Sequence, residues 1–439
     1  MEKGPARVEV LEESTNRPIR HLVTGNSRHD AILKSFDVLK ERGFFETLRR
    51  GSLLPDEPPL YGYRTEVGAG VSFFDETQAL LRTLGETLER GLWERRWQEK
   101  TKNVSYQKLH RLFNLKNLAG FSIEQQEAFL SEVIRTNPDI ACVHGYTHTR
   151  NRRCLVPLQL VNKDHFVSAV AKNRNEPRLR TAITTGLATG KSPEESQLKG
   201  FLEVIERDAF MVSFLNSLTL PRIHLAHLAK QYPELAVVHE LCERYKLELS
   251  FIRLLTDAPV HVYTAIITDR TKKGPAVAVG AKASFSLVET LLGAAAEAMA
   301  VRFMHKNSFE EVEKTPCTQF GRLERLKWWS NIDQLPKIQD FISGPFESPY
   351  NVPPINSAVE GLARIRMYCK KNSYQMISVP YRYPVSQKLT LYVSYCLIPE
   401  MHPLYLNECY PAKSSVRLSS MPKQFGYEGK ENLTPHPFP

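Results

Sequence analysis

Carboxylates and arginines recur at helical spacing in three parts of the chain. In each part, glutamates lie three positions apart or an arginine follows a glutamate by four or five positions. Residues three and four apart share one face of a helix, so each set can point into one cleft. Neighbouring carboxylates repel one another unless a cation lies between them, and Mg²⁺ prefers oxygen ligands of this kind. Arginine side chains, in turn, bind phosphate oxygens well. The residues are Glu86, Glu89 and Arg90, then Glu203, Glu206 and Arg207, and finally Glu297 and Arg302.

A glycine-bearing segment precedes each of these helices. The segments are GAGVS at 68–72, TTGLATGKS at 184–192 and GAKAS at 280–284. Each helix then begins with capping-box spacing, in Asp75 and Gln78, Ser192 and Glu195, and Ser286 and Glu289. The chain therefore repeats one site-building unit, a glycine-bearing segment followed by a capped helix, which we call a cassette. In the second cassette Glu195 lies eleven positions before Glu206, a rise of about 16 Å, which fits the length of a polyphosphate.

Helices and short strands alternate in the predicted organisation. Residues 358–371 predict a helix, and residues 306–357, rich in proline and glycine, predict an irregular insertion. Residues 426–439 end in alternating prolines and predict a stiff, polyproline-like tail with a free terminal carboxylate. Segments rich in Val, Ile, Leu and Tyr predict strands at 154–161, 259–269, 274–281 and 388–399.

Composition and charge narrow the class of protein. The 439 residues are 42% hydrophobic, enough for one large core or two ordinary domains. With neither a stretch of 18 apolar residues nor an apolar leader, we expect a cytoplasmic protein without membrane association. The 7 cysteines are scattered, which predicts neither a disulfide frame nor a zinc site. The net charge of +10 fits an acidic peptide or a phosphorylated ligand. We do not expect nucleic acid, because no nucleic-acid-binding motif accompanies the charge.

Other interpretations compete with a carboxylate site. Each E-x-x-E-R segment taken singly also fits a solvated helix face with ion pairs. TTGLATGKS is close to a phosphate-binding P-loop, but Thr185 stands where the first glycine of that motif is needed for the turn. HGYTH gives His144 and His148 the spacing of a zinc site, yet it lacks the neighbouring carboxylate that would act as base.

Taken together, these residues resemble a YcaO-domain protein of the azoline-forming kind. The resemblance rests on the cassettes, on the phrase IPEMHPLYLNE at 398–408 and on the ending ENLTPHPFP. It implies an α+β YcaO fold, in which mixed β-sheets are flanked by helices and the cassettes repeat. On this resemblance residues 61–439 form the YcaO domain, and residues 1–60 form an N-terminal extension too short for a fused E1-like or leader-binding domain.

The resemblance also implies a site for ATP and Mg²⁺ between the helices. Its metal and nucleotide carboxylates would be Glu86, Glu89, Glu195, Glu203 and Glu206. The further nucleotide contacts would be Arg207, Arg302, Lys191, Arg28 and Ser35. The tail, with Pro435, Pro437 and Pro439, would place a terminal carboxylate as base or orienting group at the site. Three basic residues depart from the family pattern, where Ser, Asn and Gln are usual: Arg82, Lys191 and Lys199.

The function implied is ATP-dependent cyclodehydration of Cys, Ser or Thr in a ribosomal precursor peptide to thiazoline or (methyl)oxazoline, by phosphorylation of the backbone amide oxygen. The implied partners are the peptide and an E1-like or leader-binding protein, with a homodimer inside a hetero-oligomer. No flavin fingerprint is present, so oxidation to azoles would need a separate flavin dehydrogenase. Two alternatives stay open: a thioamide- or amidine-forming enzyme of the same fold, and a non-catalytic scaffold subunit.

Overall fold

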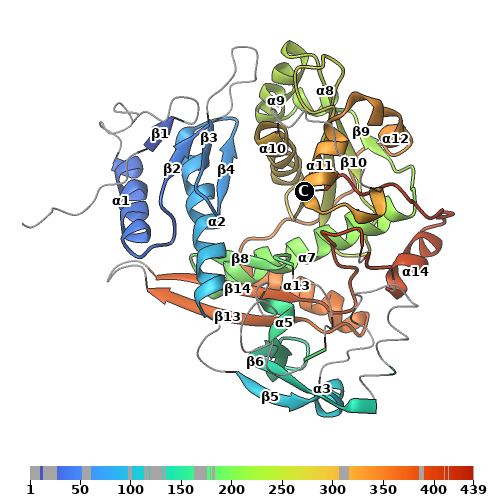
Figure 1. The fold of residues 1–439 in the computed structure, drawn as a ribbon. Helices are drawn as coiled ribbons and strands as arrows, with labels where there is room; N and C mark the ends of the chain where they lie inside the picture. Colours follow the sequence, from blue (N-terminus) through green and yellow to red (C-terminus); the bar gives the residue numbers. More distant parts are fainter. Residues whose placement is uncertain are drawn as a thin grey trace, which may run out of the picture.

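The computed structural model describes residues 10–12, 27–51, 61–96, 101–112, 118, 131, 135–162, 176–177, 179, 183–305, 316–384, 390–409, 411–413 and 415–438. Within these ranges the strands form three sheets, with helices packed on and between them (Figure 1). The expected α+β class is confirmed. The described part of the chain contains no helix long and apolar enough to cross a membrane.

The first sheet combines strands from both sides of residue 60. β1 pairs with β2 in parallel, and β2, β3 and β4 follow in antiparallel order. The sheet therefore crosses the boundary that we assigned to an N-terminal extension, because β2 needs β3 as its hydrogen-bonding neighbour. The elements are β1 (Val10–Glu12), α1 (Ser27–Glu41), β2 (Leu48–Arg50), β3 (Tyr61–Arg64), β4 (Ala69–Ser72) and α2 (Glu76–Arg96).

The second sheet joins strands that are far apart in sequence, in the order β5-β6-β13-β14-β8, with β7 also paired to β6. The helix predicted at 358–371 is confirmed as α13, whereas the strand predicted at 154–161 ends at Pro157, where a short helix begins. The elements are β5 (Lys102–Ser105), α3 (Tyr106–Leu112), β6 (Asp139–Thr147), β7 (Arg152–Pro157), α5 (Leu158–Val161), β8 (Leu187–Gly190), α7 (Pro193–Leu215), α13 (Ala358–Lys371), β13 (Ile377–Pro384) and β14 (Thr390–Leu397).

The third sheet is buried on both faces. It runs in the antiparallel order β12-β11-β10-β9, and every residue of β11 is buried. Side chains alternate between the two faces of a strand, so Val262 packs in the core cluster around α7 while Tyr263 packs in the cluster under α9 and α10. The elements are β9 (Arg222–Ile223), α8 (Leu225–Ala229), α9 (Pro233–Arg244), β10 (Leu247–Arg253), β11 (His261–Asp269), β12 (Val277–Ser284) and α10 (Leu287–His305).

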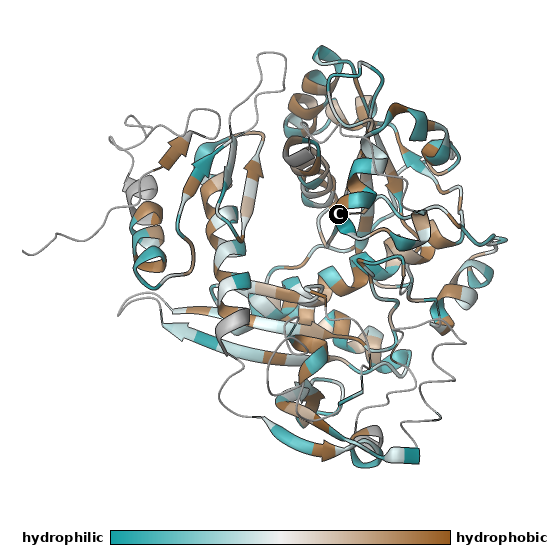
Figure 2. Ribbon diagram, in the orientation of Figure 1, coloured by the Kyte–Doolittle hydropathy of each residue, from teal (hydrophilic) through white to brown (hydrophobic). Residues whose placement is uncertain are grey.

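The segment predicted as an irregular insertion is partly helical. It contains α11 (Arg322–Ser330) and α12 (Leu335–Gln339), whereas residues 340–357 form no helix and no regular strand. The prediction was wrong for α11 because Arg325, Leu326 and Trp329 supply a buried helical face. After α14 (Val416–Gln424) the chain runs to residue 438 without helix or strand, as expected of a proline-rich tail. Figure 2 shows that helices such as α1 and α2 carry both hydrophobic and hydrophilic residues, as helices with one buried face do.

Each cassette begins on an edge strand of a different sheet. The pairs are β4 with α2, β8 with α7, and β12 with α10. Close packing within a pair requires glycine: a Cβ on Gly70 would lie 2.5 Å from the carbonyl oxygen of Ala79, and one on Gly280 would lie 2.4 Å from that of Ala294. Each helix also contacts the strand of the next cassette, α2 on β8, α7 on β12 and α10 on β4. The three cassettes thus form a closed ring that brings the three sheets together.

Candidate functional site

Local capping fixes where each cassette helix begins. The backbone N–H of Gln78 donates to the Asp75 carboxylate at 2.7 Å, and that of Glu195 donates to Ser192 Oγ at 3.1 Å. The third cap is longer, with the Glu289 N–H 3.4 Å from Ser286 Oγ. All three predicted caps are confirmed. Residues next to each helix in sequence therefore set where it begins, and with it the direction in which its side chains point.

One glutamate of each helix binds the backbone of the glycine-bearing segment in its own cassette. A carboxylate oxygen of Glu86 accepts the Ala69 N–H at 2.7 Å, and Glu203 accepts the Gly186 N–H at 3.0 Å. Glu297 accepts the Ala281 N–H at 2.9 Å in the same way. A carboxylate thus satisfies each of these backbone N–H groups and is held in place by it.

A second glutamate, three positions later, reaches the strand of the next cassette. Glu89 of α2 accepts a hydrogen bond from the backbone of Thr189 in β8. Glu206 of α7 accepts the Ala283 N–H of β12 at 2.9 Å. In α10 this position is Ala300, so the third cassette adds one carboxylate where the others add two.

Arg207 joins the second and third cassettes. Its guanidinium lies 3.3 Å from Glu203, 3.2 Å from Glu206 and 3.3 Å from Glu297, and only 11% of the side chain is exposed. Arg90 makes the corresponding ion pair with Glu86 on α2. In Glu86, Glu203, Glu206 and Glu297, therefore, one oxygen takes a backbone N–H and the other faces an arginine.

Burial perturbs the carboxylates of this cluster. It raises the pKa of Glu206 to about 7 against the opposing attraction of Arg207 and Lys282. Burial also raises the pKa of Glu203 and, together with the nearby charges of Glu203 and Glu86, that of Glu89. The electrostatic coupling of Glu89 with Glu203 shows that the first two cassettes meet at the same place. Carboxylates with such pKa values favour protonation or a bound cation over an unpaired charge.

Two further cations face the cluster, and sequence reasoning missed both as site residues. Lys282 of β12 lies close enough to lower the pKa of Glu203 and Glu206, and its stem packs over Gly293 of α10. Arg322, the first residue of α11, is exposed to solvent and lies near both Arg90 and Glu86. The signal for Lys282 was its position two residues after Gly280 in the third cassette.

Arg302 does not join this cluster. Its guanidinium pairs with Asp269 at 2.9 Å, and both side chains are almost fully buried. The reason is helical geometry: five positions after Glu297 correspond to a rotation of about 140°, which turns Arg302 to another face of α10. Four positions after Glu297 stands Val301 instead.

The start of α7 holds a separate, more exposed group. Glu195 accepts the Lys191 N–H at 3.0 Å and pairs with the Lys199 ammonium at 2.6 Å. Burial alone would raise the pKa of Glu195, but these bonds keep it below its ordinary value. Glu195 lies eight positions, about 12 Å along the helix axis, before Glu203. Residues 187–190 form strand β8, so TTGLATGKS is not folded as a P-loop.

The other residues singled out from the sequence lie on α2 and α1. Arg82 of α2 donates to the Val71 carbonyl at 2.6 Å and lies near Asp75 and Glu289. Ser35 is half-buried in α1, which packs against α2. Arg28 falls in the first turn of α1, but its side chain lies outside the described residues.

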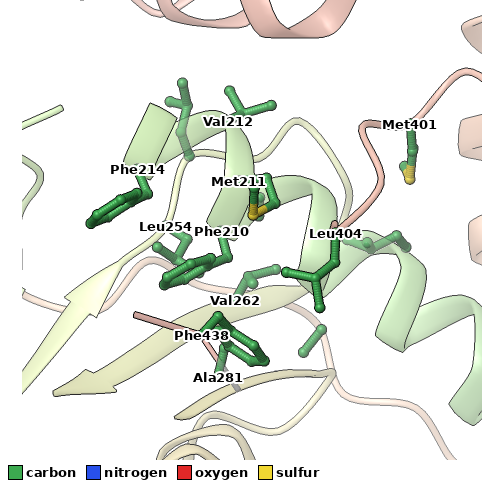
Figure 3. Close-up of a cluster of buried hydrophobic side chains, with 14 of the residues drawn as sticks. Phe210, Met211, Val212, Phe214, Leu254, Val262, Ala281, Met401, Leu404 and Phe438 are labelled. Atoms are coloured by element: carbon green, nitrogen blue, oxygen red, sulfur yellow. The ribbon is translucent and has the colours of Figure 1, made fainter. Parts of the chain in front are cut away.

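The proline-rich tail reaches the cluster. Residues 435–438 are all buried, and the ring of Phe438 lies 4.0 Å from the guanidinium carbon of Arg207. Figure 3 shows Phe438 beside Phe210 of α7, and their ring centroids are 4.8 Å apart. Pro439 lies outside the described residues. The carboxylate cluster and the described end of the tail therefore share Arg207.

The two histidines of HGYTH do not form a metal site in this arrangement. His144 is exposed on β6, while His148 bonds Ser378 at 2.9 Å, and burial lowers its pKa to about 4. Across the described ranges, no three acidic, histidine or cysteine side chains are placed to hold one metal ion as they stand. In the carboxylate cluster an arginine faces one oxygen of Glu86, Glu203, Glu206 and Glu297.

Comparison with known proteins matches this geometry to one family. Residues 72–402 match the model of a family described as YcaO cyclodehydratase, ATP- and Mg²⁺-binding. No curated protein gives a significant sequence match. Solved structures share the fold. A heterocyclase in complex with substrate and cofactor has TM-score 0.73 and 16% identity. The match covers 94% of this chain and 57% of the heterocyclase chain.

Two other solved structures are similar over most of their length. The E. coli microcin synthetase McbBCD complex has TM-score 0.59 and 11% identity, covering 85% of this chain and 94% of its own. YcaO from Methanopyrus kandleri, bound with AMPPCP and Mg²⁺, has TM-score 0.60 and 15% identity. The match covers 89% of this chain and 95% of the Methanopyrus chain. This chain spans just over half the length of the substrate-bound heterocyclase. From the family match over most of its length, the chain belongs to the YcaO family.

Proposed function

We propose that this chain is an ATP-dependent peptide cyclodehydratase that converts Cys, Ser or Thr residues of a precursor peptide to azolines. The observation that carries the proposal is the meeting of two kinds of group on Arg207. On one side lie the carboxylates of the second and third cassettes, and on the other lies Phe438 of the proline-rich tail. A phosphate-handling cluster and a peptide-modifying tail would need such proximity.

The proposed reaction follows a balanced course. The thiol or hydroxyl of the peptide attacks the preceding backbone carbonyl carbon and gives a hemiorthoamide, whose oxygen is a poor leaving group. Transfer of the γ-phosphoryl group of ATP to that oxygen releases ADP. Loss of inorganic phosphate together with the amide proton then closes the C=N bond of the ring. One water is removed from the peptide for each ring formed, and one ATP is consumed.

The residues present fit Mg²⁺ by their chemistry. The carboxylate oxygens that face arginine, in Glu86, Glu203 and Glu206, are hard ligands of the kind Mg²⁺ prefers. To bind a cation, these oxygens would exchange their arginine partner. When bound, Mg²⁺ would offset charge on the transferred phosphoryl group.

The cations of the cluster have complementary roles in this proposal. Arg207 and Arg90, once freed from the carboxylates, can donate to phosphate oxygens, for which the guanidinium fork is well suited. Lys282 adds positive charge beside Glu203 and Glu206, and Arg322 adds it beside Glu86. Together they would stabilise the negative charge that is transferred with the phosphoryl group.

Peptide recognition is assigned to a partner in this proposal. The substrate-bound heterocyclase is nearly twice as long as the stretch that this chain matches, and the microcin synthetase is a complex of several proteins. We therefore propose that an E1-like or leader-binding protein delivers the peptide, and that the chain works within such a complex in the cytoplasm.

Reconstitution tests the proposal. The full chain, an E1-like partner and a Cys/Ser/Thr-rich precursor peptide should, with ATP and Mg²⁺, give peptide lighter by one water per ring, together with ADP and phosphate. Glu203→Gln should abolish the mass loss, because a neutral amide cannot serve as a metal ligand of equal strength. Glu360→Gln is the matched control, since Glu360 pairs with Arg364 four positions later but lies on α13. Equal activity of both variants would contradict the site assignment.

The same experiment separates the two alternatives. A thioamide- or amidine-forming enzyme would replace the amide oxygen only when sulfide or an amine is supplied, and the mass change would differ from loss of water. A scaffold subunit would leave ATP intact in every mixture. Contact between the tail and Arg207 favours cyclodehydration over both.

A further inference from the structure

We propose that Arg325 and Trp329 of α11 are positioning residues that hold the tail against Arg207 and thereby align the ring-forming step. This inference rests on the proposed cyclodehydratase function. It assigns a role to a helix that sequence analysis placed inside an irregular insertion.

Both residues donate to tail carbonyls. The Trp329 indole N–H donates to the Pro435 carbonyl at 2.9 Å, and Arg325 Nη2 donates to the Phe438 carbonyl at 3.1 Å. The donors lie four positions apart, on one face of α11. Because prolines supply no N–H and the tail has no secondary structure of its own, its buried carbonyls depend on donors from other elements.

Arg325 is itself fixed from a second direction. The side chain has 0% exposure, and Nη1 lies 3.4 Å from the Glu408 carboxylate and 3.3 Å from the Leu406 carbonyl. A buried guanidinium is tolerated only with such partners, so its position is over-determined. The Phe438 carbonyl therefore meets a donor that cannot easily shift.

The opposite side of the tail packs on α7. The Asn432 N–H donates to the Leu215 carbonyl at 2.8 Å, which satisfies a carbonyl at the end of that helix. Further along, the Phe438 ring contacts both the Phe210 ring and the Arg207 guanidinium. The tail is thus held by α7 at Asn432 and by α11 at Pro435 and Phe438.

The consequence concerns alignment. If α11 released the tail, the stacking of Phe438 on Arg207 would no longer be fixed, while the carboxylates would keep their bonds to the strands. A misplacement of about 1 Å at a reacting group can lower a rate by about a hundredfold. Loss of the α11 contacts should therefore slow ring formation more than it weakens ATP binding.

The test uses substitutions that remove the hydrogen-bond donors and leave apolar side chains in their place. Trp329→Phe removes the indole donor. Trp328→Phe on the same helix is its control, because the ring contacts of Trp328 in the described part of the chain are with Phe320 and Trp329. Arg325→Met combined with Glu408→Gln removes the second donor without leaving a buried carboxylate unpaired. Hydrogen exchange of residues 426–438, measured by mass spectrometry on the full chain, reports tail anchoring whether or not the chain is active.

We expect exchange of the tail to accelerate about tenfold in Trp329→Phe and in the double variant, the effect of one lost hydrogen bond, and not in Trp328→Phe. In the reconstituted complex, kcat for ring formation should fall about tenfold or more while KM for ATP stays within about twofold. Unchanged exchange in both test variants, or faster exchange with wild-type kcat, overturns the inference. If wild-type chain forms no rings, the proposed function fails, and the exchange measurement still decides whether α11 holds the tail.

Discussion

Arg207→Met should destabilise the protein without metal and make its stability depend on Mg²⁺. The nearest oxygens of Glu203 and Glu297 each lie 3.3 Å from the same guanidinium nitrogen, so they are at most twice that distance apart. At about 6 Å and an effective dielectric constant of about 20, two unit charges repel by about 3 kcal/mol. Removing one member of a buried ion cluster lowers the free energy of unfolding by about 3–5 kcal/mol in total. The loss does not exceed this range, because the carboxylates can take up protons and so reduce their mutual repulsion.

That loss converts to a measurable shift in melting temperature. An unfolding entropy of about 2.1 cal/mol/K per residue gives about 0.9 kcal/mol/K for 439 residues, so Tm should fall by about 3–5 °C. Differential scanning calorimetry of wild type and variant, in EDTA and in Mg²⁺, measures it. In Mg²⁺ the variant should recover most of the difference, because the cation replaces the lost positive charge. Arg364→Met, which breaks the similar pair with Glu360 on α13, is the control and should not respond to Mg²⁺.

The pH dependence of the same variant has a defined sign. Burial raises the pKa of Glu206 from its ordinary 4.5 to about 7, and Arg207 opposes that rise. A carboxyl whose folded pKa is raised stabilises the fold below its unfolded pKa and loses that effect as pH increases through the folded value. Without Arg207 the folded pKa rises further, so the deficit in EDTA should be larger at pH 8 than at pH 6. A variant as stable as wild type in EDTA, or one that gains no more from Mg²⁺ than wild type, would refute the view of this cluster as a cation site.

Three further outcomes can be checked on the same protein. Gly280→Ala should lower stability by about 1–3 kcal/mol in urea unfolding, because the new Cβ would lie 2.4 Å from a carbonyl oxygen of α10, and an unchanged midpoint would contradict the close packing. Arg417→Met should cost about 3–5 kcal/mol in the same assay, since Arg417 pairs with buried Asp208 at 2.6 Å, and Asp208→Asn in the same chain should recover part of the loss. Lys191→Ala should reduce ATP turnover modestly whereas Glu203→Ala abolishes it; the reverse order in steady-state kinetics would revive the P-loop interpretation.

Sequence reasoning succeeded where the determining contacts are local. The three caps and the helix at 358–371 depend on residues less than twenty positions apart. The meeting of cassettes could not be derived in the same way, because Arg207 reaches Glu297 across 90 positions and from another sheet. The recurrence of the cassettes and the family resemblance, rather than any spacing along the chain, predicted that the helices would share one site.

Two errors have identifiable physical causes. Arg302 was grouped with Glu297 although a spacing of five positions turns it off the shared helix face. In α11, prolines and glycines on either side obscured a short helix whose buried residues, Arg325, Leu326 and Trp329, follow helical spacing. A glycine N-cap followed by Glu324 was the available signal for its start.

The ring of cassettes has a consequence for how the molecule acquires its shape. Each cassette helix docks on a strand from the next one along, and the last of them, α10, returns to β4 more than 200 positions earlier. Contacts of such long range close slowly, after local units have formed, because the entropy of loop closure opposes them. The carboxylate cluster should therefore assemble at the end of folding, when the three sheets dock. Any ligand that bridges the cassettes would capture that final docked state and draw partly assembled molecules toward it.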